Sequence, residues 1–169
     1  MNIQAPRLQI VNFNKSHKPG LINFFTNKQN TQFLFLEESQ KTMKGAGELF
    51  DFVVSNYRTE NHIHSYAITN KNGEFIGSCG FSPLEDSYEC YYSIAIEYCG
   101  NGYATESLKA LIKYCFDSLG FNELIANIIP ENIASEKVAI KAGMQYLKNS
   151  VNKENGSKIK VYKIKNRYK

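Results

Sequence analysis

Two glycines one residue apart, Gly100 and Gly102, stand between a strand-like run and a helix-like run in this chain of 169 residues. Glycine lets a ligand approach the backbone closely, because it has no side chain. The first N–H groups of a helix have no partner inside the helix, and the helix dipole places about half a positive charge at that end. The Gly100-Asn101-Gly102 turn therefore predicts a binding site for a phosphate or pyrophosphate group.

The Gly-x-Gly spacing is by itself a weak signal. The turn lacks the third glycine of the dinucleotide fingerprint and the Gly-Lys-Ser/Thr of a P-loop. An ordinary glycine-rich turn between a strand and a helix stays open as an alternative.

Length and composition indicate one globular domain, and we expect residues 1–169 to form it. The cysteines and histidines show no metal-ligand spacing, so we expect no metal site. The N-terminus has no basic start followed by an apolar segment, and no run is long enough to cross a membrane. These features predict a soluble cytoplasmic protein with reduced thiols, with no membrane contact. The cysteines are Cys79, Cys90, Cys99 and Cys115.

The net charge of +4 is mild, and much of the excess lies near the C-terminus. It is carried there by Lys158, Lys160, Lys163, Lys165, Arg167 and Lys169. A solvated face on a last strand followed by a tail is the simpler interpretation. A surface that favours polyanions such as RNA is the alternative, which charge alone does not exclude. We expect no nucleic-acid partner.

Apolar spacing and turn residues predict the order β, helices, then β-β-β-α-β-α-β-β. The predicted strands occupy 7–13, a hairpin over 64–81 around Asn72-Gly73, 88–96, 122–129, and a hairpin over 144–164 around Asn155-Gly156. The predicted helices lie within 16–36, over 48–58 with an apolar stripe of Leu49, Phe52, Val53 and Tyr57, and over 103–119 and 132–143. Such an order, with a βαβ element, favours an α/β or α+β sheet covered by helices.

The central part of the chain, from residue 88 to residue 144, carries a family resemblance. Glu89 and Tyr92 precede the turn, which continues as Tyr103-Ala104-Thr105-Glu106-Ser107. A later helix opens with Pro130-Glu131-Asn132 and Ser135 and ends at Gly143-Met144. This block resembles the GNAT N-acetyltransferase superfamily, and most closely its ribosomal-protein N-terminal (Rim-type) branch. The resemblance implies a splayed, mostly antiparallel sheet of six or seven strands with helices on both faces.

The resemblance also implies a site for acetyl-CoA. Its pyrophosphate would bind the backbone amides from Cys99 to Thr105, and its pantetheine arm would lie between the strands at 92–96 and 124–128. A β-bulge near Ile94 to Ile96 would present an amide N–H to the thioester carbonyl. The implied cofactor-binding residues are Ile94, Ala95, Ile96, Cys99, Gly100, Asn101, Gly102, Tyr103, Ala104, Thr105, Asn132 and Ser135.

Acetyl transfer to an amine needs a base, because free amines are largely protonated near pH 7. Glu89 matches the family's strand glutamate and is the candidate; a strand glutamate paired with a lysine is the alternative. The departing thiolate needs a proton or a hydrogen bond. The family's usual tyrosine position is Ala139 here, so the Rim-type serine, Ser135, is the candidate. Asn132 would contact the pantetheine, although it also suits a helix N-cap.

The expected function is transfer of an acetyl group from acetyl-CoA to a primary amine, by direct attack in a ternary complex of a monomer or homodimer. The amine could belong to a protein N-terminus or to a small molecule. A polyamine is less favoured, because its site would need a denser acidic cluster than Glu37 and Glu38, the main acidic pair of 16–47. The alternative is an inactive module that binds CoA, protein or RNA. Cys99, where the family often has Gln, Arg or Trp, is either an acidic thiol at a helix N-terminus or a small apolar filler.

Overall fold

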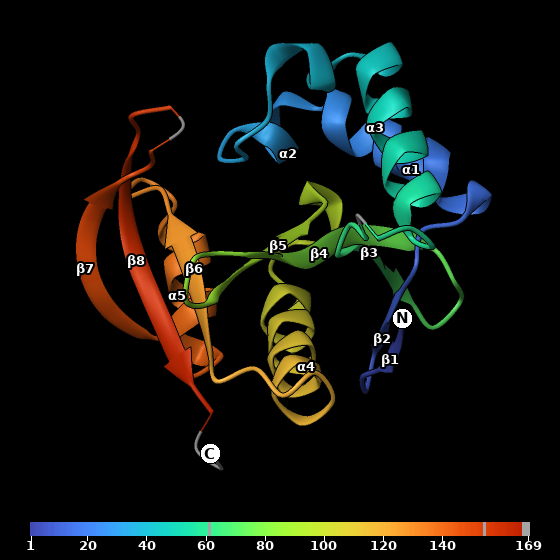
Figure 1. Cartoon of the computed structure of the whole chain (residues 1–169). Helices are drawn as coiled ribbons and strands as arrows, with labels where there is room; N and C mark the ends of the chain where they lie inside the picture. The colour runs from blue at the N-terminus through green and yellow to red at the C-terminus, as the bar shows by residue number, and fades with distance from the viewer. Residues whose placement is uncertain (61, 154, 167–169) are drawn as a thin grey trace.

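The computed structural model of the chain describes residues 1–60, 62–153 and 155–166. Eight strands form one sheet in the order β1-β2-β3-β4-β5-β6-β8-β7, and every neighbouring pair is antiparallel except β5 and β6 (Figure 1). The strands are β1 (Asn2–Gln4), β2 (Leu8–Val11), β3 (Ser65–Asn70), β4 (Phe75–Pro83), β5 (Tyr88–Ile94), β6 (Glu123–Ile128), β7 (Gln145–Val151) and β8 (Lys158–Lys165). The predicted six or seven strands become eight because β1 has three residues, too few to show a period.

Helices cover both faces of this sheet, as predicted. One side carries α1 (Lys18–Thr26), α2 (Lys28–Thr31) and α3 (Met43–Asn56), which Figure 1 shows together above β3 to β5. The other side carries α4 (Tyr103–Asp117) and α5 (Ile133–Lys141). Each layer has its own buried cluster, one around Phe24 and Phe50 and the other around Leu108 and Leu111. Short 3-10 turns at Lys15–His17, Glu38–Lys41 and Ile96–Tyr98 join these elements.

The helix α3 begins five residues before its predicted start, and its apolar stripe is shifted. The Thr42 side chain caps it by accepting a hydrogen bond from the Gly45 N–H (3.0 Å). Position 45, inside the helix, requires glycine, because a Cβ there would lie 2.0 Å from the Ser39 carbonyl oxygen. Phe50 and Val53 are buried, whereas Phe52, which the stripe placed inside, is 55% exposed.

The central strands β5 and β6 separate soon after they meet. They run parallel and pair at one position, Glu89 with Ile125, while β5 pairs with β4 along its whole length. Beyond Glu89 the two strands therefore leave a wedge between them, as the resemblance implied. Residues of an antiparallel pair alternate in the edge to which their N–H and C=O groups point. Since the Ala95 N–H donates to the Ile76 carbonyl (2.9 Å), this alternation directs the backbone groups of Tyr92 and Ile94 into the wedge.

Candidate active site

The glycine turn lies where β5 ends and α4 begins. Gly100 and Gly102 have φ angles of 81° and 80°, in the left-handed region that glycine adopts at little cost. Gly102 is the N-cap of α4, whose first helical residue is Tyr103. A Cβ built at Gly100 would meet no other atom within 4 Å, so the space beside this turn is open. The backbone amides from Cys99 to Thr105 thus surround the positive end of a 15-residue helix.

Arg7 supports this turn, and sequence reasoning missed it. Its Nη1 donates to the Asn101 carbonyl (2.8 Å), and its Nε pairs with Glu106 Oε2 (2.7 Å). The guanidinium also lies 4.9 Å from the centroid of the Tyr103 ring. A fixed positive charge therefore stands beside the amides that suit an anion. No local pattern in the sequence signals this, because Arg7 comes from the segment before β2, far from the turn along the chain.

The structure favours neither interpretation of Cys99. The residue is exposed, so it is not an apolar filler. Loss of hydration around the thiol raises the pKa of Cys99, and the nearby Glu97 carboxylate adds to this effect, which argues against an acidic thiol. Its Sγ donates to the Ile94 carbonyl (3.6 Å), which ties the turn back to the end of β5.

The predicted β-bulge near Ile94 to Ile96 is not found in the described residues of β4 and β5, whose pairing runs in one register. The Ala95 N–H donates to the Ile76 carbonyl, and the Ile96 N–H donates to Asn30 Oδ1 (2.8 Å) on α2. The chain instead leaves β5 through the 3-10 turn at Ile96–Tyr98. Of these three residues, Ile94 alone directs its N–H toward the wedge by the alternation described above.

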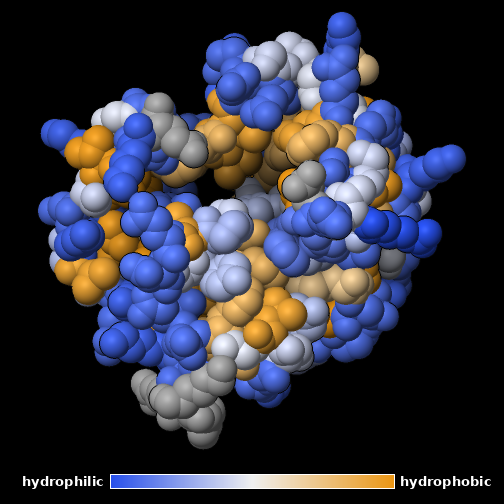
Figure 2. Space-filling view, in the orientation of Figure 1, coloured by the Kyte–Doolittle hydropathy of each residue, from blue (hydrophilic) through white to orange (hydrophobic). Residues whose placement is uncertain are grey.

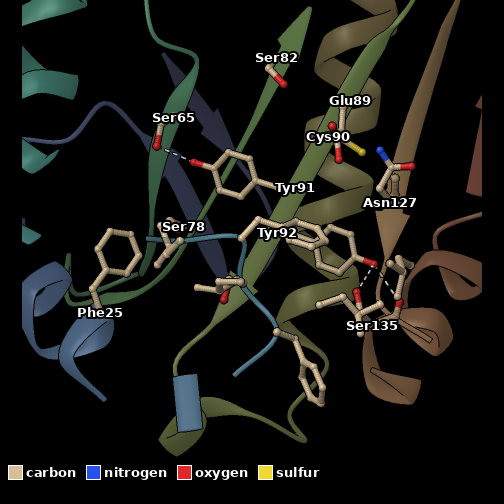
Figure 3. Close-up of a pocket in the computed structure, with 18 of the residues that line it drawn as sticks. Phe25, Ser65, Ser78, Ser82, Glu89, Cys90, Tyr91, Tyr92, Asn127 and Ser135 are labelled. Atoms are coloured by element: carbon tan, nitrogen blue, oxygen red, sulfur yellow. Dashed lines mark hydrogen bonds between the residues drawn. The ribbon is translucent and has the colours of Figure 1, made fainter. Parts of the chain in front are cut away.

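A cavity of about 480 Å³ fills the wedge and extends beneath α1 to α3. Figure 2 shows the molecule hollowed there, with hydrophobic residues gathered around the hollow. Three predicted residues line it: Glu89 on β5, Asn132 at the start of α5, and Ser135 one turn later. Glu89 and Ser135 therefore reach the same cavity from opposite sides of the wedge (Figure 3).

Ser135 is held by two neighbours, one of them unforeseen. The Asn132 side chain is the N-cap of α5 and accepts from the Ser135 N–H (3.1 Å), so the capping interpretation is confirmed. The Ser135 hydroxyl donates to the Tyr92 hydroxyl (2.9 Å), which in turn donates to the Ser135 carbonyl (2.8 Å) (Figure 3). Burial raises the pKa of Tyr92, so this phenol is a neutral hydrogen-bonding group. Ala139, where the family's usual tyrosine would stand, is fully buried.

A second hydroxyl pair lines the same cavity as Glu89. The Tyr91 hydroxyl and the Ser65 hydroxyl are 2.5 Å apart, and both residues line the cavity. Glu89 and Tyr91 are two residues apart on β5, so their side chains stand on the same face of the sheet. Tyr91 as a whole is 39% exposed, and loss of hydration around its hydroxyl raises the pKa of this tyrosine as well.

The basic C-terminal strand is partly neutralised. Lys160 pairs with Glu136 (2.9 Å) and Lys163 pairs with Glu123 (2.8 Å). Arg167 and Lys169 lie outside the described residues. The pairs favour the solvated-face interpretation over a polyanion site.

The described residues contain neither a membrane-spanning helix nor a metal-ligand cluster. The helices found there are too short or too polar to span a bilayer. Across the same residues, no three His, Cys, Asp or Glu side chains gather so that they could hold a metal ion.

Two curated bacterial proteins illustrate the similarity in sequence. The uncharacterized protein YkkB of Bacillus subtilis is 42% identical over 82 residues, which cover 46% of this chain and 48% of YkkB. The chain thus matches about half the length of that relative. The uncharacterized N-acetyltransferase YoaA of the same organism is 24% identical over 146 residues, 85% of this chain and 82% of YoaA.

Solved structures show the same fold along nearly the whole chain. A GNAT-family acetyltransferase from Bacillus anthracis superposes with a TM-score of 0.82 at 20% identity, and the match covers 98% of both chains. RimL, a ribosomal L7/L12 alpha-N-protein acetyltransferase in complex with coenzyme A, gives a TM-score of 0.81 at 18% identity, also over 98% of both chains.

The family itself is shown by a match to the acetyltransferase (GNAT) domain over residues 7–145. This span includes the glycine turn, the wedge between β5 and β6, and the helix that carries Ser135. The chain therefore belongs to the GNAT family of acetyltransferases, enzymes that use acetyl-CoA.

Proposed function

We propose that this protein transfers an acetyl group from acetyl-CoA directly to a primary amine, with both substrates held at once. The observation that carries the proposal is the wedge: the glycine turn stands at its open end, and Glu89 and Ser135 face its cavity from two sides. The amine belongs to a protein N-terminus or to a small molecule. RimL acts on a ribosomal protein, as its name states, and the likeness to it supports the first class.

The residues of the turn fit the pyrophosphate of acetyl-CoA. The open space at Gly100, the amides from Cys99 to Thr105 and the Arg7 guanidinium together offer hydrogen-bond donors and positive charge. When bound, acetyl-CoA supplies an acetyl group activated as a thioester. In this proposal the backbone groups of Tyr92 would pair with the pantetheine amides, and the Ile94 N–H would donate to the thioester carbonyl.

Glu89 is the proposed base. Its carboxylate lines the cavity on the side that faces α1 to α3, where the amine would enter. It would accept a proton from the ammonium form of the acceptor, either directly or through a water, and so leave the amine with a free electron pair.

Ser135 is the proposed donor to the departing thiolate. Its hydroxyl now donates to the Tyr92 hydroxyl. If the Ser135 hydroxyl turned toward the wedge, it would donate a hydrogen bond to the sulfur instead of to Tyr92. The Tyr92 hydroxyl would then donate to Ser135 Oγ instead of to the Ser135 carbonyl. Tyr92 keeps its own proton in this scheme, which agrees with its raised pKa.

The continuous sheet from β1 to β7 supports the further proposal that 1–169 is one domain.

The test is turnover with a matched pair of variants. The purified protein is incubated with acetyl-CoA and a panel of primary amines, and the released CoA thiol is measured. Glu89→Gln is expected to lower kcat by about 10²-fold or more near pH 7, while acetyl-CoA affinity by calorimetry stays unchanged. Glu85→Gln, which changes an exposed carboxylate of the β4–β5 turn outside the cavity, should behave as wild type.

Binding of acetyl-CoA without acetylation of any amine would overturn the proposal and leave an inactive CoA-binding module. A Glu89→Gln variant with full activity would remove Glu89 from the role of base.

A further inference from the structure

The half of the cavity that faces α1 to α3, where the amine would enter, has an apolar wall. This wall is built by α1 and by the loop that follows α2. Phe25 reaches it from α1, and the consecutive residues Phe33, Leu34, Phe35 and Leu36 reach it from the loop. Hydrogen bonds from the Leu34 N–H to the Thr31 carbonyl (3.1 Å) and from the Leu36 N–H to the Leu34 carbonyl (2.9 Å) shape this loop. Phe35 is 41% exposed, and the other three loop residues are half-buried. Apolar residues gathered at the mouth of a cavity are typical of a ligand-binding wall.

Deeper in the cavity the apolar surface continues. Its floor on this side is formed by Leu21, Leu49, Val53 and Ile63, which come from α1, α3 and the segment before β3. The polar groups of this half are few and are mainly hydroxyls, among them the Ser65 and Tyr91 pair. A molecule that enters here therefore meets apolar surface around its body and polar groups near Glu89.

The charge of the lining is as informative as its apolar character. Glu89 is the one acidic residue among the described residues that line the cavity, and no lysine, arginine or histidine is among them. The acidic pair that could have attracted a polyamine is elsewhere: Glu37 and Glu38 are exposed outside the lining, and Glu38 pairs with Lys41 (2.6 Å). A second ammonium group in the cavity would be buried without a counter-charge, and so would a carboxylate, at a large desolvation cost.

We infer that the acceptor is a primary amine on an aromatic or branched apolar body, with no second positive charge and no carboxylate beside the amino group. This inference rests on the transferase function proposed above and names the substrate class of the same site. Two sources share this chemistry: a small arylalkylamine, and a peptide whose first residue is large and apolar.

The first test compares kcat/KM, by release of CoA thiol, for 2-phenylethylamine, L-phenylalaninamide, free L-phenylalanine and spermidine. The first two are expected to exceed the last two by about tenfold or more, because the latter bring an unpaired charge into the cavity. Two hexapeptides, one beginning with phenylalanine and one with serine, distinguish the sources. Acetylation of the phenylalanine peptide at the rate of the amide indicates a chain terminus, and restriction to the small amines indicates a small molecule.

Preference for spermidine, free phenylalanine or the serine peptide would overturn the inference and leave the transferase function standing. Release of no CoA thiol with any amine, despite acetyl-CoA binding, would overturn both.

Variants of the wall give a second, independent readout. Phe33→Ser is expected to lower kcat/KM for 2-phenylethylamine about tenfold without changing acetyl-CoA affinity. Its matched control is Phe52→Ser, which removes a ring that is 55% exposed on α3 and outside the cavity. Leu36→Asp adds a second carboxylate to the cavity lining, besides Glu89, and it should shift the ratio of spermidine to 2-phenylethylamine activity about tenfold toward spermidine. Unchanged ratios in folded Phe33→Ser and Leu36→Asp proteins would contradict the inferred role of this wall.

Discussion

The Tyr92 hydroxyl lies 2.9 Å from Ser135 Oγ and donates to the carbonyl of the same serine, so two hydrogen bonds join β5 to α5 across the wedge. Because Asn132 also accepts from the Ser135 N–H, the serine is fixed at its amide, its carbonyl and its hydroxyl. A tyrosine on the strand thus positions this serine. The family's usual tyrosine is absent: its position, one helical turn after Ser135, is occupied by Ala139. Ser135 is thus the proposed donor to the departing thiolate, and Tyr92 is the residue that orients it.

The pair predicts two different kinetic losses. Ser135→Ala should lower kcat by about 10²-fold, since it removes the proposed hydrogen-bond donor to the departing thiolate. Tyr92→Phe should lower kcat less, by about tenfold, because the serine remains but has lost the hydroxyl that orients it. KM for acetyl-CoA should change little in either variant. Steady-state kinetics checks both, with Tyr146→Phe, an exposed tyrosine on β7, as the control. Equal kinetics for Tyr92→Phe and wild type would show that the contact is structural only.

Left-handed backbone at the turn predicts a binding defect for Gly102→Ala. Alanine at a φ of 80° is strained by about 1–2 kcal/mol, and its Cβ would lie 3.4 Å from Arg7 Nη2. We expect acetyl-CoA affinity by calorimetry to fall about tenfold, and Gly102→Glu to abolish binding by adding a carboxylate next to the proposed pyrophosphate site. Gly73→Ala is the matched control, because Gly73 has a φ of 82° in the β3–β4 turn with no other atom within 4 Å of its Cβ. It should lose similar stability and keep its affinity; equal affinity losses in both alanine variants would point to strain alone.

Arg7 predicts a salt-dependent contribution to the same affinity. Arg7→Met removes the cation beside the turn and the hydrogen bond to the Asn101 carbonyl, so the Kd for acetyl-CoA should rise about tenfold at low ionic strength. The difference from wild type should shrink as salt is added. Lys113→Met, which removes a cation paired with Asp117 near the other end of α4, serves as the control. A loss of affinity that does not vary with salt would show that Arg7 acts through the shape of the turn and not through its charge.

Several parts of the fold and site could be predicted from the sequence because their signals are local. The Asn72-Gly73 turn, the helix after Gly102 and the N-cap at Asn132 each depend on residues within a few positions of one another. The strand β1 and the phase of α3 could not be predicted, because three residues show no period and Gly45 is required by a contact with Ser39.

The rest of the site depends on contacts that are distant along the chain. Arg7 reaches Asn101, and Tyr92 reaches Ser135, through the arrangement of the sheet. The apolar run Phe33–Leu36 was visible in the sequence, but without a period it gave no sign that it would line a cavity with Glu89. The predicted bulge failed for a related reason, since Asn30 of α2 supplies the partner that holds the Ile96 amide.

One buried and one half-buried histidine, His17 and His64, predict that the free energy of unfolding falls in mild acid. Burial lowers the pKa of His17 and of His64, and His62, whose ring centroid is 4.5 Å away, lowers that of His64 further. The unfolded chain therefore binds more protons than the native state below about pH 6.5. The contribution of these neutral histidines to the free energy of unfolding is fully present above that pH and is lost as the pH falls toward the native pKa values. Urea unfolding should give a smaller free energy of unfolding at pH 5.5 than at pH 7.5. His64→Gln, which can still hydrogen-bond the Tyr66 hydroxyl, should reduce the difference between the two pH values; the same difference in wild type and variant would exclude His64 as its source.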